Sequence, residues 1–273
     1  MWCDEMMALW VPIAVYWVVC SFYEVLMRLQ LHALEKYRLH SPNDRDRRNK
    51  VSFIKVVVMV AVQHMIQFVF GYFLLDVQHP SVREVNHYMA ITRTTRRLGA
   101  YLGLTNANHI AWLWHHAVVP FIQFFLAMCY IDTHQYFLHR LGHTSKFMYK
   151  HFHSLHHRLY VPYAFGALYN HVVEGFMLDT LGAGIAYELT GMSPKMGMTL
   201  FTFSNIKTIN DHCGYNFPWD PLNLIFKNNG AYHDIHHQPY GIKTNFAQPF
   251  FTFWDRLFNT EFDQTAKRSV KPN

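Results

Sequence analysis

Two long apolar runs dominate the first third of the chain. Residues 10–27 are apolar apart from Ser21 and Glu24, and residues 51–75 form a second run of similar character. An α-helix needs about 20 mostly apolar residues to cross the hydrocarbon core of a bilayer. The pattern therefore predicts two membrane spans, and we expect residues 1–116 to form an N-terminal membrane anchor.

A third apolar run covers residues 117–131, and a helical continuation carries it directly into His139. We expect a third span at about 117–138, which opens a second domain over residues 117–273.

Two shorter apolar stretches follow later, at 172–190 and 196–209, joined by the sequence Gly-Met-Ser-Pro-Lys. Glycine and proline favour a turn, so residues 172–209 are expected to form a hairpin that enters the membrane and returns to the same side. The alternative is a buried hairpin of a soluble helical domain. The predicted fold class is mostly α, a multi-pass helical membrane protein with a cytoplasmic helical cap.

Composition agrees with a lipid environment for much of the surface. Hydrophobic residues make up 51% of the chain and charged residues 15%, against about 25% charged in ordinary soluble domains. The mean hydropathy of −0.03 is low for a membrane protein, because segments rich in His, Arg and Asn dilute the average. The four cysteines have no CxxC spacing, which argues against a disulfide framework or a thiolate zinc site.

The formal net charge of +6 does not indicate a nucleic-acid partner, because the basic residues are dispersed and no reading motif is present. Seven basic residues lie between the first two apolar runs and four in the next polar segment. Basic residues concentrate on the cytoplasmic side of membrane proteins, so the first loop is assigned to the cytoplasm. The third span then delivers the following polar segment to the same side.

Three histidine clusters carry the most specific chemistry. One is H-R-L-G-H, and the other two share the spacing HxxHH although they lie about eighty residues apart. Residues at i, i+3 and i+4 share one face of a helix, so each cluster is expected to aim its imidazoles at a single point. Their members are His139, His143, His153, His156, His157, His233, His236 and His237.

Three further residues have suggestive positions. His212 and His171 fall at the ends of the expected hairpin, near the clusters, and are candidate ligands; the alternative for each is a hydrogen-bonded interfacial histidine. Asp132 precedes His139 by two helical turns and is expected to accept the second ring N–H of a ligating histidine.

The ligand types indicate the metal. Imidazole ligation without bridging carboxylates suits iron, zinc or copper more than magnesium or calcium. Eight to ten histidines exceed the four of a structural zinc site, so two metal ions with a catalytic role are expected. Iron suits oxidation of an unreactive C–H bond by dioxygen, and zinc is a possible substitute in a purified sample. No GxSxG, HExxH, GxGxxG or P-loop motif points to another enzyme class.

These boxes resemble the fatty acid hydroxylase (sterol desaturase) superfamily, whose pattern is HxxxH, HxxHH, HxxHH around a di-iron centre. The similarity covers roughly residues 132–260. Within the superfamily, several stretches resemble plant-type sphinganine C-4 hydroxylases, and the C-terminal signature is also similar. These stretches are 149–164, 167–174, 207–214 and 232–238, and the signature lies at 248–251 and 253–260.

The resemblance implies a monooxygenase of the endoplasmic reticulum membrane with its histidine boxes facing the cytoplasm. It would hydroxylate carbon 4 of sphinganine, free or in ceramide, to give phytosphingosine. Electrons would come from NADH through a reductase and cytochrome b5, which is a separate protein because the chain has no HPGG haem-binding segment and no bound haem is expected. Candidate outer-shell or head-group contacts are Arg158, Tyr163, Asn170 and Tyr240.

Two other functions stay open. One is another activity of the superfamily, that of a sterol C-4 methyl oxidase or C-5 desaturase. The other is a non-catalytic metal-binding membrane protein, such as a regulator or transporter. The chain departs from plant-type relatives at His134, where they usually carry Trp, and at the insertion 98–116.

Overall fold

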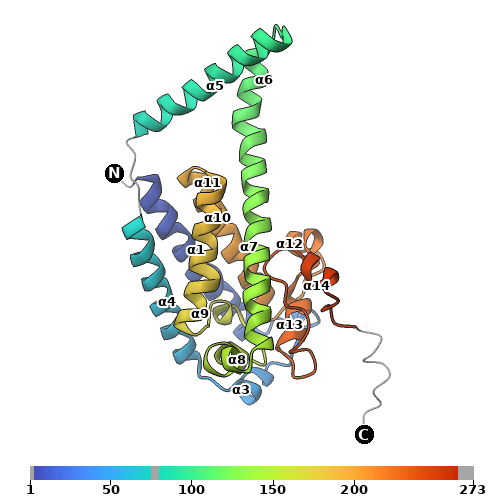
Figure 1. Ribbon diagram of the computed structural model, residues 1–273. Helices are drawn as coiled ribbons and strands as arrows, with labels where there is room; N and C mark the ends of the chain where they lie inside the picture. The colour runs from blue at the N-terminus through green and yellow to red at the C-terminus, as the bar shows by residue number, and fades with distance from the viewer. Residues whose placement is uncertain (1–2, 75–79, 264–273) are drawn as a thin grey trace.

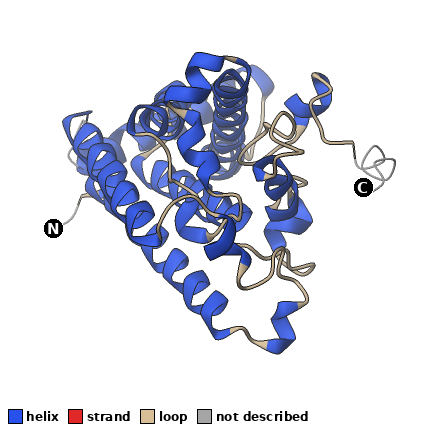
Figure 2. Ribbon diagram, turned by 90° about the horizontal axis from the view of Figure 1, so that it is seen from below, coloured by secondary structure: helices blue, strands red, loops and turns tan. Residues whose placement is uncertain are grey.

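The computed structural model describes residues 3–74 and 80–263, which form helices joined by loops, with no β-strand in this part of the chain (Figures 1 and 2). The N-terminal half contains α1 (Asp4–Leu29), α2 (His32–Glu35), α3 (Asp44–Arg48), α4 (Phe53–Leu74), α5 (Pro80–Leu102), α6 (Ala107–Leu113) and α7 (Val119–Thr144). The C-terminal half contains α8 (Lys146–His151), α9 (Val172–Gly175), α10 (Gly182–Thr190), α11 (Pro194–His212), α12 (Pro221–Ile225), α13 (Gly230–His237) and α14 (Phe253–Leu257). The prediction of a mostly helical protein is confirmed.

Three helical stretches are long and apolar enough to cross a membrane. They are Asp4–Leu29, Phe53–Leu74 and Ala107–Thr144. Most of their side chains are not covered by the rest of the protein, as expected for helices that face lipid. The chain is therefore a multi-pass membrane protein.

The third of these stretches begins at Ala107, ten residues before the start that the sequence suggested at Ala117. Helix α6 continues into α7 through a π-helical turn, Trp114–Val118, so the helix does not break where the apolar run begins. The segment 98–116 therefore includes the end of α5 and the beginning of this long helix. The apolar pattern located the span but not the polar helical turns that extend it.

Helices α10 and α11 are joined by a short turn. Gly191 ends α10 with a φ of 59°, a left-handed conformation that glycine adopts without strain. Ser193 then caps α11 by accepting a hydrogen bond from the backbone N–H of Met196. Helix α10 packs against α7 and α11 packs along α1, so the pair joins the two sides of the bundle.

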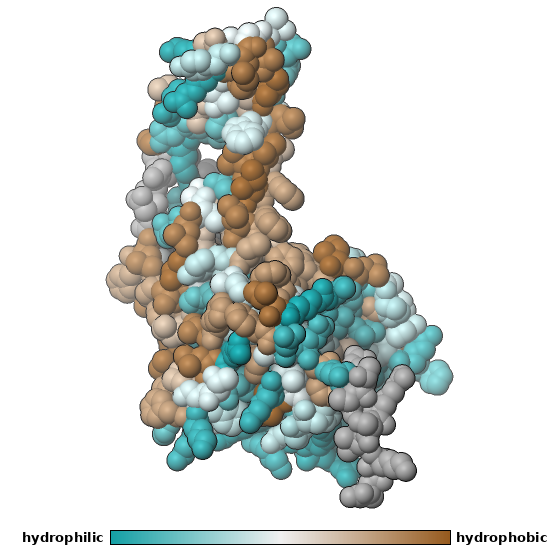
Figure 3. All heavy atoms as spheres, turned by 45° about the vertical axis from the view of Figure 1, so that its right-hand side comes forward, coloured by the Kyte–Doolittle hydropathy of each residue, from teal (hydrophilic) through white to brown (hydrophobic). Residues whose placement is uncertain are grey.

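The segments that carry the histidine clusters lie at one end of the bundle, and α5 lies across the other (Figure 1). The surface between these ends is largely apolar, whereas the histidine end is covered by polar side chains (Figure 3). This distribution places the histidine clusters just outside the apolar belt.

A loop between residues 159 and 169 fills the space between the membrane helices and the histidine end. Its side chains pack with Tyr16 and Cys20 of α1 and with Ile209 of α11 in a buried cluster. The Tyr16 hydroxyl donates a hydrogen bond to the Phe165 carbonyl at 3.1 Å. The loop is therefore fixed from the membrane side, which positions the histidines on its other side.

Candidate metal centre

The first two histidine boxes are consecutive in space. Helix α7 presents His139 and His143 one turn apart at its end, and α8 follows directly. The second box lies in a 3₁₀ turn, His153–Arg158, and not in the α-helix that the HxxHH spacing suggested. The short turn is stabilised by tertiary contacts that sequence spacing does not reveal.

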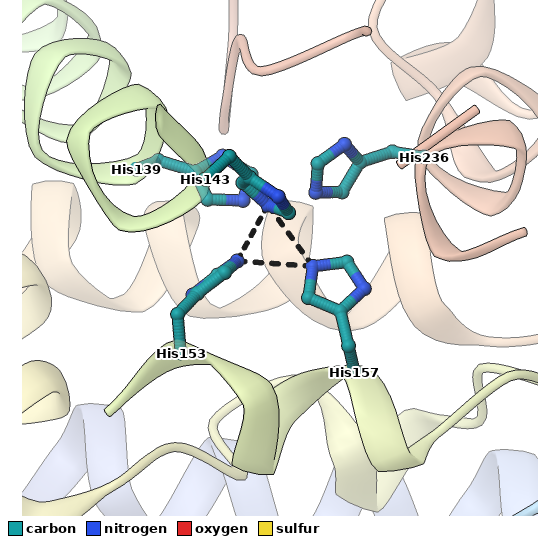
Figure 4. A group of neighbouring side chains, drawn as sticks. All are labelled: His139, His143, His153, His157 and His236. Atoms are coloured by element: carbon teal, nitrogen blue, oxygen red, sulfur yellow. Dashed lines mark hydrogen bonds between the residues drawn. The ribbon is translucent and has the colours of Figure 1, made fainter. Parts of the chain in front are cut away.

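The histidines converge in two groups. A five-histidine group contains His139, His143, His153, His157 and His236, and a four-histidine group contains His156, His212, His233 and His237. In each group one ligand atom of every ring lies within 4.8 Å of all the others. Figure 4 shows His153 and His157 reaching the first group from below the end of α7, with His236 opposite.

The expectation that each box aims at a single point is confirmed for His139 and His143, which join the same group, but it is wrong for the two HxxHH boxes. The second box sends His153 and His157 to the five-histidine group but His156 to the other. The third box divides in the same way, since His236 joins the first group whereas its two neighbours join the second. Each HxxHH box therefore contributes to both groups, which holds the two sites next to each other.

Backbone carbonyls orient most of these rings. The Nδ1 atom of His139 lies 2.8 Å from the Phe246 carbonyl, and that of His237 lies 2.8 Å from the Leu159 carbonyl. A carbonyl only accepts, so each Nδ1 carries the hydrogen and each Nε2 keeps its lone pair for the group interior. The same arrangement holds for His156 with Tyr169, His212 with Thr208 and His236 with Thr244.

The Nε2 atoms that point into each group are better placed to bind a metal ion than to form hydrogen bonds with one another. In the five-histidine group the Nε2 atom of His153 lies 2.6 Å from that of His143 and 2.9 Å from that of His157. In the four-histidine group the Nε2 atom of His233 is 3.1 Å from that of His212 and 3.0 Å from that of His237.

A single proton cannot serve two such contacts, and the buried Nε2 atom of His236 has no hydrogen-bond partner among the described residues. A cation in each group would bind the lone pairs together. The chain can therefore hold two metal ions.

Burial keeps the imidazoles neutral, which is the metal-binding form. It lowers the pKa of His153 to about 3 and that of His156 to about 4. Burial and the neighbouring imidazoles lower the pKa of the remaining box residues outside the spans well below the usual range; these are His157, His233, His236 and His237.

Asp132 does not contact a histidine, which corrects the role expected for it. Its carboxylate accepts the backbone N–H groups of Phe250 at 2.9 Å and Phe251 at 2.6 Å. The two-turn spacing placed Asp132 on the correct face of α7, but the C-terminal loop occupies that face. Asp132 therefore supports the loop whose Phe246 carbonyl orients His139.

His171 lies outside both groups. Its Nδ1 atom accepts the backbone N–H of Val173 at 3.2 Å and caps α9, and its ring packs against Phe152. This position matches the hydrogen-bonded alternative given for it above. Nine of the ten candidate ligands thus come together, including His212.

The four candidate outer contacts lie in different surroundings. Asn170 lines a cavity beside the histidines, and Tyr163 is buried beneath the guanidinium of Arg45. Arg158 and Tyr240 are exposed. Of these four, Asn170 is the residue placed to contact a molecule at the metal centre.

Two carboxylates that were not predicted as site residues complete the site. Glu174 accepts a hydrogen bond from Nδ1 of His153, and Asp255 accepts the backbone N–H groups of Phe246 and Ala247. Asp255 lies in the C-terminal stretch 253–260, so its sequence context pointed to it. Glu174 lies 21 residues from its partner, and no spacing rule reveals that contact.

The comparison with family models agrees with this geometry. The fatty acid hydroxylase model matches residues 124–260, which include all nine converging histidines. The chain belongs to the fatty acid hydroxylase family.

Relatives in this family align over nearly the whole chain. The sphingolipid C4-hydroxylase sur2 of Schizosaccharomyces pombe is 43% identical over 96% of this chain and 93% of its own length. The sphinganine C4-monooxygenase 2 of Arabidopsis thaliana is 43% identical over 94% of this chain and 88% of its own length. The very-long-chain aldehyde decarbonylase GL1-9 of Oryza sativa subsp. indica is 38% identical over 97% and 92%. No solved structure matches this fatty acid hydroxylase.

Proposed function

We propose that this chain is a sphinganine C4-monooxygenase that hydroxylates carbon 4 of a sphingoid base to give phytosphingosine. The observation that carries the proposal is the convergence of nine histidines in two adjacent buried groups at the edge of an apolar belt. The named C4-hydroxylases align with 94–96% of this chain and with 88–93% of their own length, which supports the same substrate class.

The two groups would hold two iron ions, with zinc as a substitute in a purified sample. Bound iron would supply the activation of dioxygen that hydroxylation of an unreactive C–H bond requires. The protein residues hold the imidazoles neutral and fix their orientation through backbone carbonyls. The deep burial of the rings excludes water from the reacting carbon.

The substrate would reach the centre from the membrane side. A cavity beside the histidines is lined by Gln135 of α7, by Leu178 and Asp179 of the hairpin, and by Ala167 of the buried loop. The lipid tail would extend along the apolar helices while the polar head remains in this cavity. Holding the head in one place fixes which carbon meets the metal centre.

The histidine end would face the cytoplasm in the endoplasmic reticulum membrane. The first basic loop packs on this end, where Arg48 donates to the Gln238 side chain at 2.5 Å and His40 contacts Asp234 at 2.6 Å. Basic loops concentrate on the cytoplasmic side, which supports this orientation. Cytochrome b5 and its NADH-dependent reductase would then deliver electrons from the cytoplasm.

Product analysis tests the proposal. The chain is expressed in cells that lack a C4-hydroxylase, and long-chain bases are measured by mass spectrometry. We expect phytosphingosine with the unaltered chain and none with a His156→Ala variant that still inserts in the membrane. Microsomes supplied with NADH should need cytochrome b5 for turnover.

Three results would contradict the proposal. Unchanged long-chain bases with altered methyl sterols would indicate a sterol oxidase or desaturase. Hydrocarbons formed from long-chain aldehydes would indicate the activity named for the rice relative. No turnover with any of these lipids, together with retained metal, would indicate a non-catalytic metal-binding protein.

A further inference from the structure

The cavity beside the histidines has one strongly polar wall. Gln135, Asn170 and Asp179 form this wall, since Asp179 contacts the other two, and the cavity lining also includes His139, His153 and His156. Gln135 precedes His139 by one helical turn, so the wall begins roughly 6 Å from the ligands along α7. A polar group bound here lies next to the metal centre and on its membrane side.

Asp179 is the unusual member of this wall. Its carboxylate accepts Gln63 at 3.1 Å, Asn170 at 3.4 Å and Gln135 at 3.4 Å, and the last two contacts are long for hydrogen bonds. No Lys, Arg or His nitrogen of the described residues lies within 4.0 Å of it. Asp179 is half-buried, and a carboxylate that is partly removed from water is costly without a cation or strong donors.

Asp211, the other carboxylate in the cavity lining, differs from Asp179 because it has a cationic partner. Asp211 is paired with Nζ of Lys207 at 2.5 Å and 2.6 Å, so its charge is balanced inside the protein. Both carboxylates line the same cavity, but only Asp179 has no Lys, Arg or His side chain of the described residues paired with it. The cavity is therefore suited to an occupant that brings a positive charge.

We propose that Asp179 binds the ammonium group at carbon 2 of a free sphingoid base, an inference that rests on the proposed C4-hydroxylation. The amine nitrogen and the reacting carbon 4 are three bonds apart, so a group that binds the amine must lie beside the metal centre. Gln135 and Asn170, also on this wall, are placed to bind the hydroxyl groups of the head. The ionic pair fixes the head and selects the free base over the N-acylated lipid, whose amide carries no charge.

The side chains around Asp179 come from separate elements, which makes the subsite rigid. Gln63 lies on α4, Gln135 on α7 and Asn170 in the loop before α9. Gln63 donates to the carboxylate, and the amides from the other two elements lie close to it, so its position is set by the fold before the substrate arrives. Asp179 is thus a binding and specificity residue, distinct from the metal ligands.

Equilibrium binding to the full-length protein in lipid nanodiscs tests the inference. The probes are sphinganine, N-acetylsphinganine and octadecane-1,3-diol, which lacks the nitrogen. We expect the unaltered protein to bind sphinganine roughly ten- to a hundredfold more tightly than either other probe, as a charged hydrogen bond supplies. The Asp179→Asn variant should lose this preference, because only its affinity for sphinganine is expected to fall. The control is Glu188→Gln, which replaces an exposed carboxylate on α10 and should retain the preference.

Turnover of the same variants separates this inference from the proposed function. The Asp179→Asn variant should raise KM for sphinganine more than it lowers kcat, with the metal content unchanged. The double variant Asp179→Asn/Asn170→Asp returns a carboxylate to the same wall and should recover part of the preference.

The affinities of the three probes can be compared on the unaltered protein alone, so a variant that fails to fold does not weaken the test. Equal affinity of the unaltered protein for all three probes would overturn the inference, even if phytosphingosine is formed. An equal loss for every probe in Asp179→Asn would also overturn it, because it would indicate a structural role. Absence of any C4-hydroxylated product would instead contradict the proposed function.

Discussion

The Asp132 carboxylate on α7 accepts the backbone N–H of Phe250 at 2.9 Å, although 118 residues separate them. This contact joins the helix that carries the first histidine box to the loop that orients His139. The Phe246 carbonyl of that loop lies 2.8 Å from Nδ1 of His139. The ligand geometry therefore depends on a buried carboxylate that touches no ligand.

Replacing Asp132 with Asn should destabilise the protein and loosen the five-histidine group. An amide presents one oxygen where two backbone N–H groups need acceptors, so one N–H is left without a partner. The expected cost is about 1–3 kcal/mol of unfolding free energy. Thermal unfolding in detergent and metal content measure it, with Asp46→Asn at an exposed carboxylate as the control. Identical behaviour of the two variants would count against this role.

Glu174→Gln should weaken one metal site without unfolding the protein. The carboxylate accepts from Nδ1 of His153, and a neutral amide accepts more weakly, so His153 becomes a poorer ligand. Loss of such a partner lowers metal affinity roughly 10–100-fold. Competition with a chelator, followed by elemental analysis, gives the affinity. Glu188→Gln is the control. If both variants lose half of their metal at the same chelator concentration, the prediction is refuted.

Neighbouring histidines of one box should affect different metal ions. His153 belongs to the five-histidine group and His156 to the four-histidine group. Single replacements by Ala at these positions should each remove about one of two metal ions. The pair His153→Ala/His236→Ala should lose only one ion, whereas His153→Ala/His233→Ala should lose both.

Metal-to-protein ratios of the purified variants measure this pattern. If each HxxHH box instead formed its own site, His153→Ala and His156→Ala would remove the same ion. The combination of the two would then be no worse than either alone. That result would contradict the division of the boxes.

Acid should release the metal and destabilise the metal-free protein in the same pH range. The pKa of His153 is lowered to about 3 and that of His156 to about 4 by burial, against about 6.5 in an unfolded chain. The unfolded state therefore binds more protons, so this stability is present above pH 6.5 and is lost as the pH falls toward 4.

Unfolding midpoints of metal-free protein and metal retention after dialysis between pH 7.5 and about 4 measure these losses. The metal-free double variant His153→Ala/His156→Ala serves as a control, because it removes two of the groups that take up protons. The unfolding midpoint of this double variant should fall less steeply as the pH is lowered. Equal slopes for the two proteins would rule out the buried imidazoles as the cause.

Lys207→Met should be strongly destabilising. The Lys207 side chain is buried and pairs with Asp211 at 2.5 Å, so its loss leaves a buried carboxylate without a cation. The expected cost is about 3–5 kcal/mol. Lys195→Met is the matched control on the same helix, because Lys195 is 74% exposed and lies 3.9 Å from Asp4, a pair worth under about 1 kcal/mol. Equal unfolding midpoints would contradict the prediction.

The sequence alone determined the membrane helices, the histidine boxes and the class of chemistry. Apolar runs near the length of a bilayer crossing predict helices directly, because a chain in lipid must satisfy its own backbone hydrogen bonds. Repeated HxxHH spacing predicts metal ligands because imidazole is a common ligand and the pattern is rare by chance. These features depend on neighbours in the sequence.

Only the tertiary structure decided how the ligands are shared and what supports them. The division of each HxxHH box between two groups, the pairing of Asp132 with Phe250 and the contact of Glu174 with His153 join residues far apart in the chain. That no cationic side chain of the described residues pairs with Asp179 also became visible only when segments far apart in the chain met around one cavity. Periodicity describes which face of a helix a residue occupies, whereas the packing of other segments onto that face determines its partner.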